Sequence, residues 1–208
     1  LQELKAWDAA AFDNFGISVA MTNNRLIVGA SGNDDLGSNS GSVYAFELNS
    51  AGYWQKWDKY NAADGSANDL FGWSLDIDGD HIVIGAFTDD HSGATDIGSA
   101  YVFSRPSASA LYTEVDKLTA SDGSDYQYFG YSVAVDNSNI VVGAFHRIST
   151  QGGAAYVYNK EAGTNSWPEA QKLVPDDNAA GDFFGLSVSL NDNRAVIVDE
   201  DYRTAVPS

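Results

Sequence analysis

The sequence contains no cysteine and only one methionine among its 208 residues. Without cysteine, the chain has no disulfide framework, no thiolate zinc site and no cysteine nucleophile. Long apolar runs are also missing: the longest extend over a few residues, whereas a membrane-spanning helix needs about 20. The sequence therefore predicts neither a disulfide-stapled scaffold nor insertion into a membrane.

Basic residues are scarce. Eleven Lys and Arg stand against 29 Asp and Glu, which gives a net charge of -18. A phosphate backbone attracts the opposite charge pattern, so nucleic acid is excluded as the expected partner, and so is an anionic membrane surface. The 44% of hydrophobic residues is sufficient for a core. The chain is expected to fold, and its charge fits solubility at high salt and cation binding.

Motifs of catalysis are absent as well. The sequence has no G-x-S-x-G nucleophile motif, no P-loop and no G-x-G-x-x-G, and its three histidines are His81, His91 and His146. These histidines occupy non-equivalent places in the repeat described next, so they predict no shared catalytic or metal cluster. The sequence predicts a protein that is not an enzyme.

A repeat organises the chain. Phe-Gly occurs at Phe15-Gly16, Phe71-Gly72, Phe129-Gly130 and Phe184-Gly185, at spacings of 56, 58 and 55 residues. Fourteen residues after the first three Phe comes Gly-Ala, at Gly29-Ala30, Gly85-Ala86 and Gly143-Ala144. Seven residues before every Phe is an Asp, namely Asp8, Asp64, Asp122 and Asp177. Fixed offsets in four copies indicate one structural unit used repeatedly.

Within each unit the hydrophobic pattern has a period of two, which is typical of strands. Four such stretches per unit of about 56 residues predict an all-β fold, a β-propeller of four-stranded antiparallel blades. The expected units are residues 9–60, 61–118 and 119–173, an incomplete unit at 174–208, and a last strand of a preceding blade at 1–8. Because propellers close with about four to eight blades, these three and a half blades are expected to belong to a larger ring, completed by further chain or by another copy.

The sequence starts without Met, and its first residues do not form a signal peptide. We therefore expect a processed or partial polypeptide.

The pattern of Phe-Gly, Gly-Ala and then G-x-x-Y-V-F resembles the FG-GAP repeat, the blade unit of the integrin α-subunit propeller. The resemblance extends over nearly the whole chain. It implies a typically seven-bladed ring, a secreted or cell-surface location, a role in recognition or adhesion, and calcium as a cofactor. Two departures are visible: Val198-Asp199 replaces Gly-Ala in the fourth unit, and no Gly-Ala is followed by proline.

The acidic stretch Asp76, Asp78 and Asp80 around Gly79 has the spacing of a calcium loop. However, the constant separation of 14 residues between Phe and Gly leaves room only for a turn of two to four residues. Asn, Asp and Gly at this point favour a type I′ hairpin, since they tolerate positive φ. We therefore interpret this stretch as a turn.

The stronger acidic feature lies in two sets of loops: those leading into the Phe-Gly strand and those after Gly-Ala. Because strands alternate in direction, both sets should emerge on one face, with 14 of the 29 acids and Arg147 as the accompanying cation. Crowded carboxylates favour a bound cation, and the candidate calcium ligands are Asp34, Asp35, Asp64, Asp69, Asp89 and Asp90. The alternative is that repeated Asp residues cap turns through backbone N–H groups, which we prefer for the Asp seven residues before Phe.

The expected function is a non-catalytic extracellular or cell-surface recognition or adhesion module. Its acidic loop face would engage another protein or a glycan, with assistance from calcium. Two alternatives stay open: a structural building block of an extracellular filament or appendage, which self-assembles, and an accessory propeller of a larger secreted hydrolase.

Overall fold

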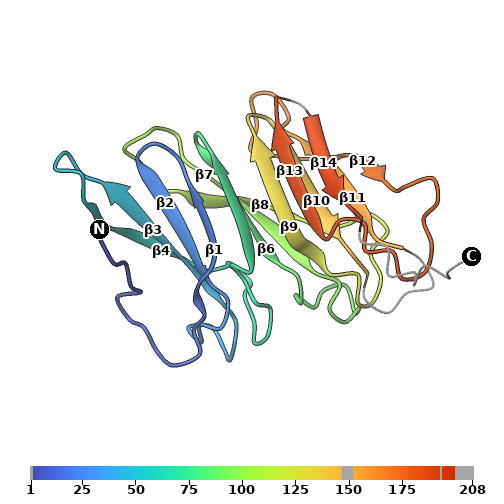
Figure 1. Cartoon of the computed structure of the whole chain (residues 1–208), viewed down its shortest axis with the longest axis horizontal. Coiled ribbons are helices and arrows are strands. Elements are labelled where there is room, and N and C mark those ends of the chain that lie inside the picture. The colour runs from blue at the N-terminus through green and yellow to red at the C-terminus, as the bar shows by residue number, and fades with distance from the viewer. Residues whose placement is uncertain (1, 147–151, 193, 200–208) are drawn as a thin grey trace, which may run out of the picture.

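The structure of the chain is a computed structural model that describes residues 2–146, 152–192 and 194–199. Every regular secondary-structure element in these ranges is a strand (Figure 1). The first blade consists of β1 (Phe15–Met21), β2 (Arg25–Ala30), β3 (Ser42–Leu48) and β4 (Trp54–Tyr60). The second consists of β5 (Ser74–Asp78), β6 (His81–Ala86), β7 (Ser99–Ser104) and β8 (Thr113–Leu118). The third consists of β9 (Phe129–Asp136), β10 (Asn139–Ala144), β11 (Ala154–Asn159) and β12 (Glu169–Leu173). A fourth hairpin follows, made of β13 (Ser187–Asn191) and β14 (Arg194–Val198).

Each blade is an antiparallel meander in which neighbours in sequence are neighbours in the sheet. The blades stand face to face along the molecule (Figure 1). The second strands β6 and β10 are therefore covered by neighbouring strands on both sides. β2 is buried at every position because the second blade covers one side and the N-terminal segment covers the other. This explains why "RLIVGA", "HIVIGA" and "NIVVGA" are continuous apolar runs rather than alternating ones. The predicted all-β fold of four-stranded blades is confirmed.

The hydrophobic core lies between blades. One cluster joins Ile27 and Val43 of the first blade to Leu75, Ile77 and other residues of the second. In the three complete blades the Phe of Phe-Gly packs against two aromatic residues of the third strand. Phe71 is fully buried, and its ring centroid lies 5.4 Å from that of Tyr101 and 6.1 Å from that of Phe103. Aromatic pairs at these separations add stability beyond the area that they bury.

A small contact recurs at every junction between blades. The Ser three residues after Phe donates its hydroxyl to the carbonyl of the next Phe-Gly glycine, in the pairs Ser18–Gly72 (2.6 Å), Ser74–Gly130 (2.8 Å) and Ser132–Gly185 (2.8 Å). The glycine of Gly-Ala lies directly beside this contact. A Cβ at Gly29, Gly85 or Gly143 would lie only 2.0, 1.9 or 2.0 Å from that same carbonyl oxygen. Glycine is required here because the next backbone occupies the place of a side chain.

One boundary differs from the expectation. Residues 2–8, predicted as the last strand of a preceding blade, contain no strand. A strand needs a partner, and no described strand pairs with this segment. Instead, the Gln2 side chain bonds the Trp54 backbone N–H and carbonyl at 2.8 and 2.7 Å, and Ala6 packs onto Tyr44 and Phe46. Over the described ranges, no helix has the length and apolar character to cross a membrane.

Candidate functional site

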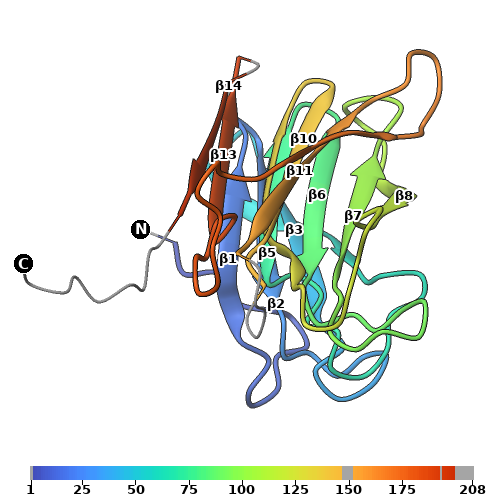
Figure 2. The ribbon, with the colours of Figure 1, turned by 90° about the vertical axis from the view of Figure 1, so that its right-hand side faces the viewer.

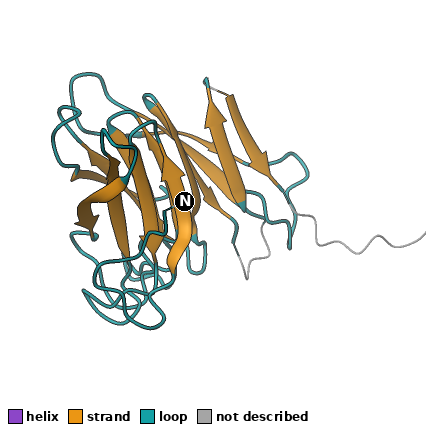
Figure 3. Ribbon diagram, turned by 60° about the vertical axis from the view of Figure 1, so that its left-hand side comes forward, coloured by secondary structure: helices purple, strands orange, loops and turns teal. Residues whose placement is uncertain are grey.

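The two sets of acidic loops do share one face, at the lower edge of the blades in Figures 2 and 3. Backbone hydrogen bonds join each loop after Gly-Ala to the next loop that leads into Phe-Gly. Between the first two blades these bonds include Asn68 N–H to the Ser38 carbonyl (2.8 Å) and Phe71 N–H to the Ser40 carbonyl (3.1 Å). We call this side of the molecule the loop face.

A repeated triad of Asp, Tyr and Lys underlies the loop face. In each complete blade, the Asp seven residues before Phe accepts a hydrogen bond from a Tyr hydroxyl on the third strand. The same carboxylate forms an ion pair with a Lys ammonium group on the fourth strand. The Tyr–Asp distances are 2.6 Å (Tyr44–Asp8), 2.9 Å (Tyr101–Asp64) and 2.7 Å (Tyr156–Asp122). The Lys–Asp distances are 2.7 Å (Lys59–Asp8), 2.6 Å (Lys117–Asp64) and 2.6 Å (Lys172–Asp122). The triad fastens the loop before each blade to that blade's outer strands.

The triads correct the expected charge of this face. We predicted Arg147 as its one accompanying cation, and Arg147 lies outside the described residues. Lys59, Lys117 and Lys172 reach the face from the outer strands and neutralise part of its charge.

The triad also changes the pKa values of its members. Burial acts to raise the pKa of Asp8, but its hydrogen bonds from Lys59 and Tyr44 outweigh burial and lower that pKa below its usual range. Burial and the bond to Asp8 raise the pKa of Tyr44 to about 12.

The acid two residues before Phe caps a turn. Asp13, Asp69 and Asp182 are buried and each accepts the backbone N–H three residues earlier, at 2.8, 2.6 and 2.8 Å. In the third blade Gln127 does the same through its amide oxygen, at 3.2 Å from the Ser124 nitrogen. Because a neutral amide replaces the carboxylate, the turn needs an acceptor and not a charge.

The other candidate calcium ligands also have protein partners. Asp34 accepts the Asn39 N–H (2.8 Å) and Asp90 the Asp96 N–H (2.6 Å). Asp35 and Asp89 pair with lysines, at 2.5 Å from Lys59 and 2.8 Å from Lys117. Across the described part of the chain, no three carboxylate or imidazole groups gather where they could hold a metal. Calcium binding by these six residues stays a prediction.

Burial of Asp69 predicts a pH-dependent variant. Its side chain is 3% exposed, and burial raises its pKa to about 6. The folded chain therefore holds this proton more tightly than the unfolded chain, and stability falls as pH rises from about 4 through 6. Asp69→Asn keeps an acceptor for Ser66 and removes the buried charge. We expect it to raise the free energy of unfolding at pH 7.5 by about 2 kcal/mol, measured by urea denaturation.

This gain should shrink toward zero at pH 4, where Asp69 is protonated in the folded wild-type chain. Asp177→Asn, at an exposed position, is the control and should change stability little at either pH. A loss of stability in Asp69→Asn at both pH values would show that the carboxylate charge is needed.

The suspected calcium stretch is a turn, as predicted. Asp78 pairs with His81, so Gly79 and Asp80 form a two-residue loop, and Gly79 has φ of +54°. Asp80 is not among the described residues with positive φ, so the turn is not the expected type I′, which needs positive φ at both positions. The carboxylates bind backbone instead: Asp76 accepts Val135 N–H at 2.9 Å and Asp78 accepts Asn137 N–H at 2.7 Å. They tie the second blade to the third.

An aromatic cleft, which the sequence interpretation missed, opens between the second and third blades. Its volume is about 430 Å³. Tyr131 of the lining belongs to the inner strand β9, and the other lining residues belong to the adjoining loops: Trp73, Phe87, Thr88, Asp96, Tyr128 and Phe145. Within the described ranges, this lining contains no Lys, Arg or His. Four of the five rings are only partly buried, Tyr128 being the exception.

The rings support one another in a continuous cluster. Centroids lie 4.8 Å apart for Trp73 and Phe87, 5.2 Å for Phe87 and Tyr131, and 4.5 Å for Tyr131 and Phe145. The first pair is tilted and the other two are edge-on, an arrangement that aromatic rings favour. Contacts on several sides limit ring rotation, so the cleft is held in shape before any ligand arrives.

The sequence held a signal for this cleft. Trp73 and Tyr131 both lie two residues after the repeat Phe, and Phe87 and Phe145 both lie sixteen after it. The first unit has Ile17 and Ser31 at these positions. Because only the second and third copies are aromatic, the pattern is not visible among features shared by all units.

Repeated four-stranded antiparallel sheets, packed face to face around their inner strands, define the class: the protein is a β-propeller repeat protein. The family model described as FG-GAP repeat matches residues 1–46, 54–103, 112–158 and 167–199. The chain therefore belongs to the FG-GAP repeat family, as its resemblance implied.

Comparison with solved structures agrees on the fold. The crystal structure of Saccharomyces cerevisiae Sqt1 is similar with a TM-score of 0.51 at 9% sequence identity, over 84% of this chain and 39% of that chain. At this identity the likeness concerns fold alone, and this chain spans well under half the length of Sqt1. Among curated proteins there is no match.

Proposed function

We propose that the protein is a non-catalytic extracellular recognition module that binds a partner protein on its loop face, with a cationic side chain of the partner held in the aromatic cleft. FG-GAP repeats are typical of extracellular proteins. The observation that carries the proposal is the cleft itself, since it presents four partly exposed aromatic rings that support one another.

The chemistry of the lining favours a cation. Aromatic faces attract a guanidinium or ammonium group through the ring quadrupole, by about 0.5–2 kcal/mol for each favourable contact. Arginine is the best match, because its planar, weakly hydrated head group stacks on aromatic rings.

The charge of the whole protein supports the same choice. A net charge of -18 raises the local concentration of basic ligands and accelerates their encounter with the loop face. Exposed charges are screened beyond about 10 Å at 0.1 M salt. Binding should therefore weaken with salt mainly through slower association.

The test is calorimetric titration with a short glycine-flanked arginine peptide, alongside the same peptide with citrulline, which has similar shape and no charge. We expect binding of the arginine peptide and binding at least tenfold weaker for citrulline. Trp73→Ala should weaken arginine binding about tenfold or more, because it removes the largest ring of the cleft. Tyr53→Ala, at a 62% exposed ring away from the cleft, is the matched control and should bind as the wild type does.

Equal affinity for arginine and citrulline, or equal effects of Trp73→Ala and Tyr53→Ala, would contradict the proposal. Binding of a neutral oligosaccharide in place of the peptide, with the same loss in Trp73→Ala, would assign the cleft to a glycan instead.

A further inference from the structure

The first blade exposes a face that the other blades bury. Its inner strand presents Val19 and Met21, which are 58% and 66% exposed. The equivalent residues of the second blade, Leu75 and Ile77, are only 9% and 6% exposed because the first blade covers them. This face of the first blade thus has the apolar residues of a blade junction, but no described strand packs against it.

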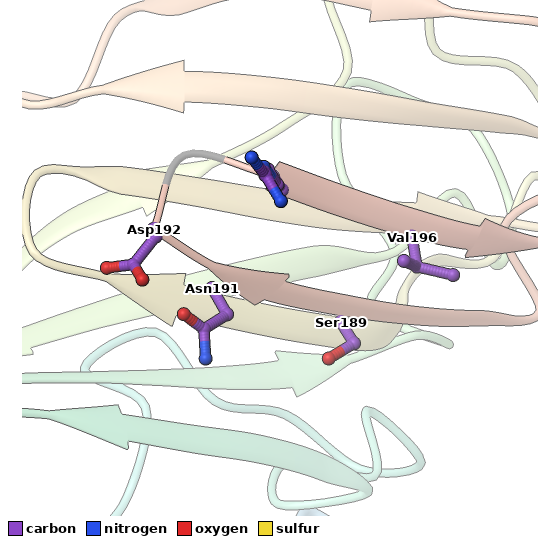
Figure 4. Close-up of a pocket in the computed structure, with 5 residues that line it drawn as sticks. Ser189, Asn191, Asp192 and Val196 are labelled. Atoms are coloured by element: carbon purple, nitrogen blue, oxygen red, sulfur yellow. The ribbon is translucent and has the colours of Figure 1, made fainter.

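The fourth hairpin exposes the complementary half. Val196 is 63% exposed, whereas its equivalents Ile27, Val83 and Val141 are at most 1% exposed against the following blade. The same face carries a shallow cleft of about 430 Å³ lined by Ser189, Asn191, Asp192, Arg194 and Val196 (Figure 4). The described residues therefore carry the parts of both junction surfaces that come from the first and second strands of a blade.

These two faces predict head-to-tail docking of copies, except at one residue. By analogy with the three internal junctions, Ser187 would donate to the Gly16 carbonyl of a second copy. Gly16 has open space around it. Ser187, however, pairs with Val198, which stands where the other units have glycine.

A side chain at this position collides with the docking backbone. A Cβ at the three equivalent glycines would lie at most 2.0 Å from the carbonyl oxygen of the next Phe-Gly glycine, and such contacts do not occur between real atoms. Backbone lies on both sides of the contact, so no side chain can rotate away to relieve it. The Cβ alone is sufficient for the collision, and the two methyl groups of valine enlarge it.

We propose that Val198 blocks head-to-tail assembly of this protein: it prevents the first-blade face of a second copy from docking on the fourth hairpin in the geometry that joins the internal blades. Val198 is thus a specificity residue of an exposed blade face. The inference is independent of the ligand of the aromatic cleft.

Sedimentation velocity over a concentration series tests the proposal with two substitutions. Val198→Gly removes the Cβ and should cause concentration-dependent association, with an apparent affinity at least tenfold tighter than in the wild type. Val198→Ala removes both methyl groups but keeps the Cβ, so it should sediment as the wild type does. Adding Val19→Asp to the Val198→Gly chain charges the opposite face and should abolish the association.

Each other outcome counts against the proposal. A Val198→Gly chain that folds, as judged by circular dichroism, and shows no added association overturns it. Equal association of the alanine and glycine variants also overturns it, because the Cβ would then not be the barrier. If Val198→Gly fails to fold, the otherwise cysteine-free chain with Met21→Cys and Ser189→Cys provides the test. Mild oxidation should give no head-to-tail multimers linked between these positions, and their formation would show that Val198 is no block.

Discussion

Gly85→Ala is expected to lower the free energy of unfolding by at least about 3 kcal/mol, or to prevent folding. The added Cβ would lie 1.9 Å from the Gly130 carbonyl oxygen and 2.3 Å from the Ser74 hydroxyl. Overpacking typically costs about 1–3 kcal/mol and sometimes more. Loss of the hydrogen bond from Ser74 to Gly130 removes about another 1 kcal/mol. Urea denaturation followed by tryptophan fluorescence measures the change.

Gly65→Ala is the matched control. Its added Cβ would meet the end of the Leu36 side chain at 2.9 Å, and this flexible side chain can move aside. We expect a loss below about 1 kcal/mol. If the two variants were equally stable, glycine at the blade junction would not be required by the approach of the next backbone.

Phe71→Ala is expected to cost about 3–5 kcal/mol, because removal of a fully buried aromatic side chain leaves a cavity. Phe71 has no exposed surface, and its ring packs against Tyr101 and Phe103. The same substitution at Phe12, which is 88% exposed, serves as the control and should change stability by less than about 0.5 kcal/mol. Thermal melts of both variants measure the difference.

A loss below about 1 kcal/mol in Phe71→Ala would mean that the repeat Phe does not anchor its blade. A large loss in Phe12→Ala would show that the exposed loop before β1 carries stability that its burial does not indicate.

The blades were predictable from sequence because their causes are local or repeated. Alternation with a period of two identifies strands, and the constant spacing of 14 residues between Phe and Gly leaves room only for a hairpin. The glycine of Gly-Ala was visible as a repeated offset between units, but the reason for it lies 42 to 45 residues further along the chain, in the carbonyl of the next Phe-Gly glycine.

The charge balance of the loop face was not predictable in the same way. Lys59 and Asp8 are 51 residues apart in sequence, and the sequence gives no direct sign that they meet. They meet because Lys59 lies on β4, the outer strand of the blade that Asp8 precedes. Tyr44 on β3 donates a hydrogen bond to the Asp8 carboxylate and so fixes it near Lys59. Counting acids by loop therefore overestimated the negative charge of the face.

The aromatic cleft depends on differences between copies. Trp73, Tyr131, Phe87 and Phe145 come together because two adjacent units have aromatic residues at the same two positions. A search for features common to all units discards such residues. In a repeat protein the shared residues build the scaffold, and a binding site is more readily found where neighbouring copies depart from the consensus.

The most direct test of recognition at the cleft is an NMR titration that follows the five tryptophan indole N–H signals as the arginine peptide is added. Trp73 is the one tryptophan in the cleft lining, so its signal should shift in a saturable way. The signals of Trp54, Trp57 and Trp167, which lie on or near the outer strands, should stay in place. A shift confined to those outer tryptophans, or no shift at peptide concentrations in the millimolar range, would contradict the account.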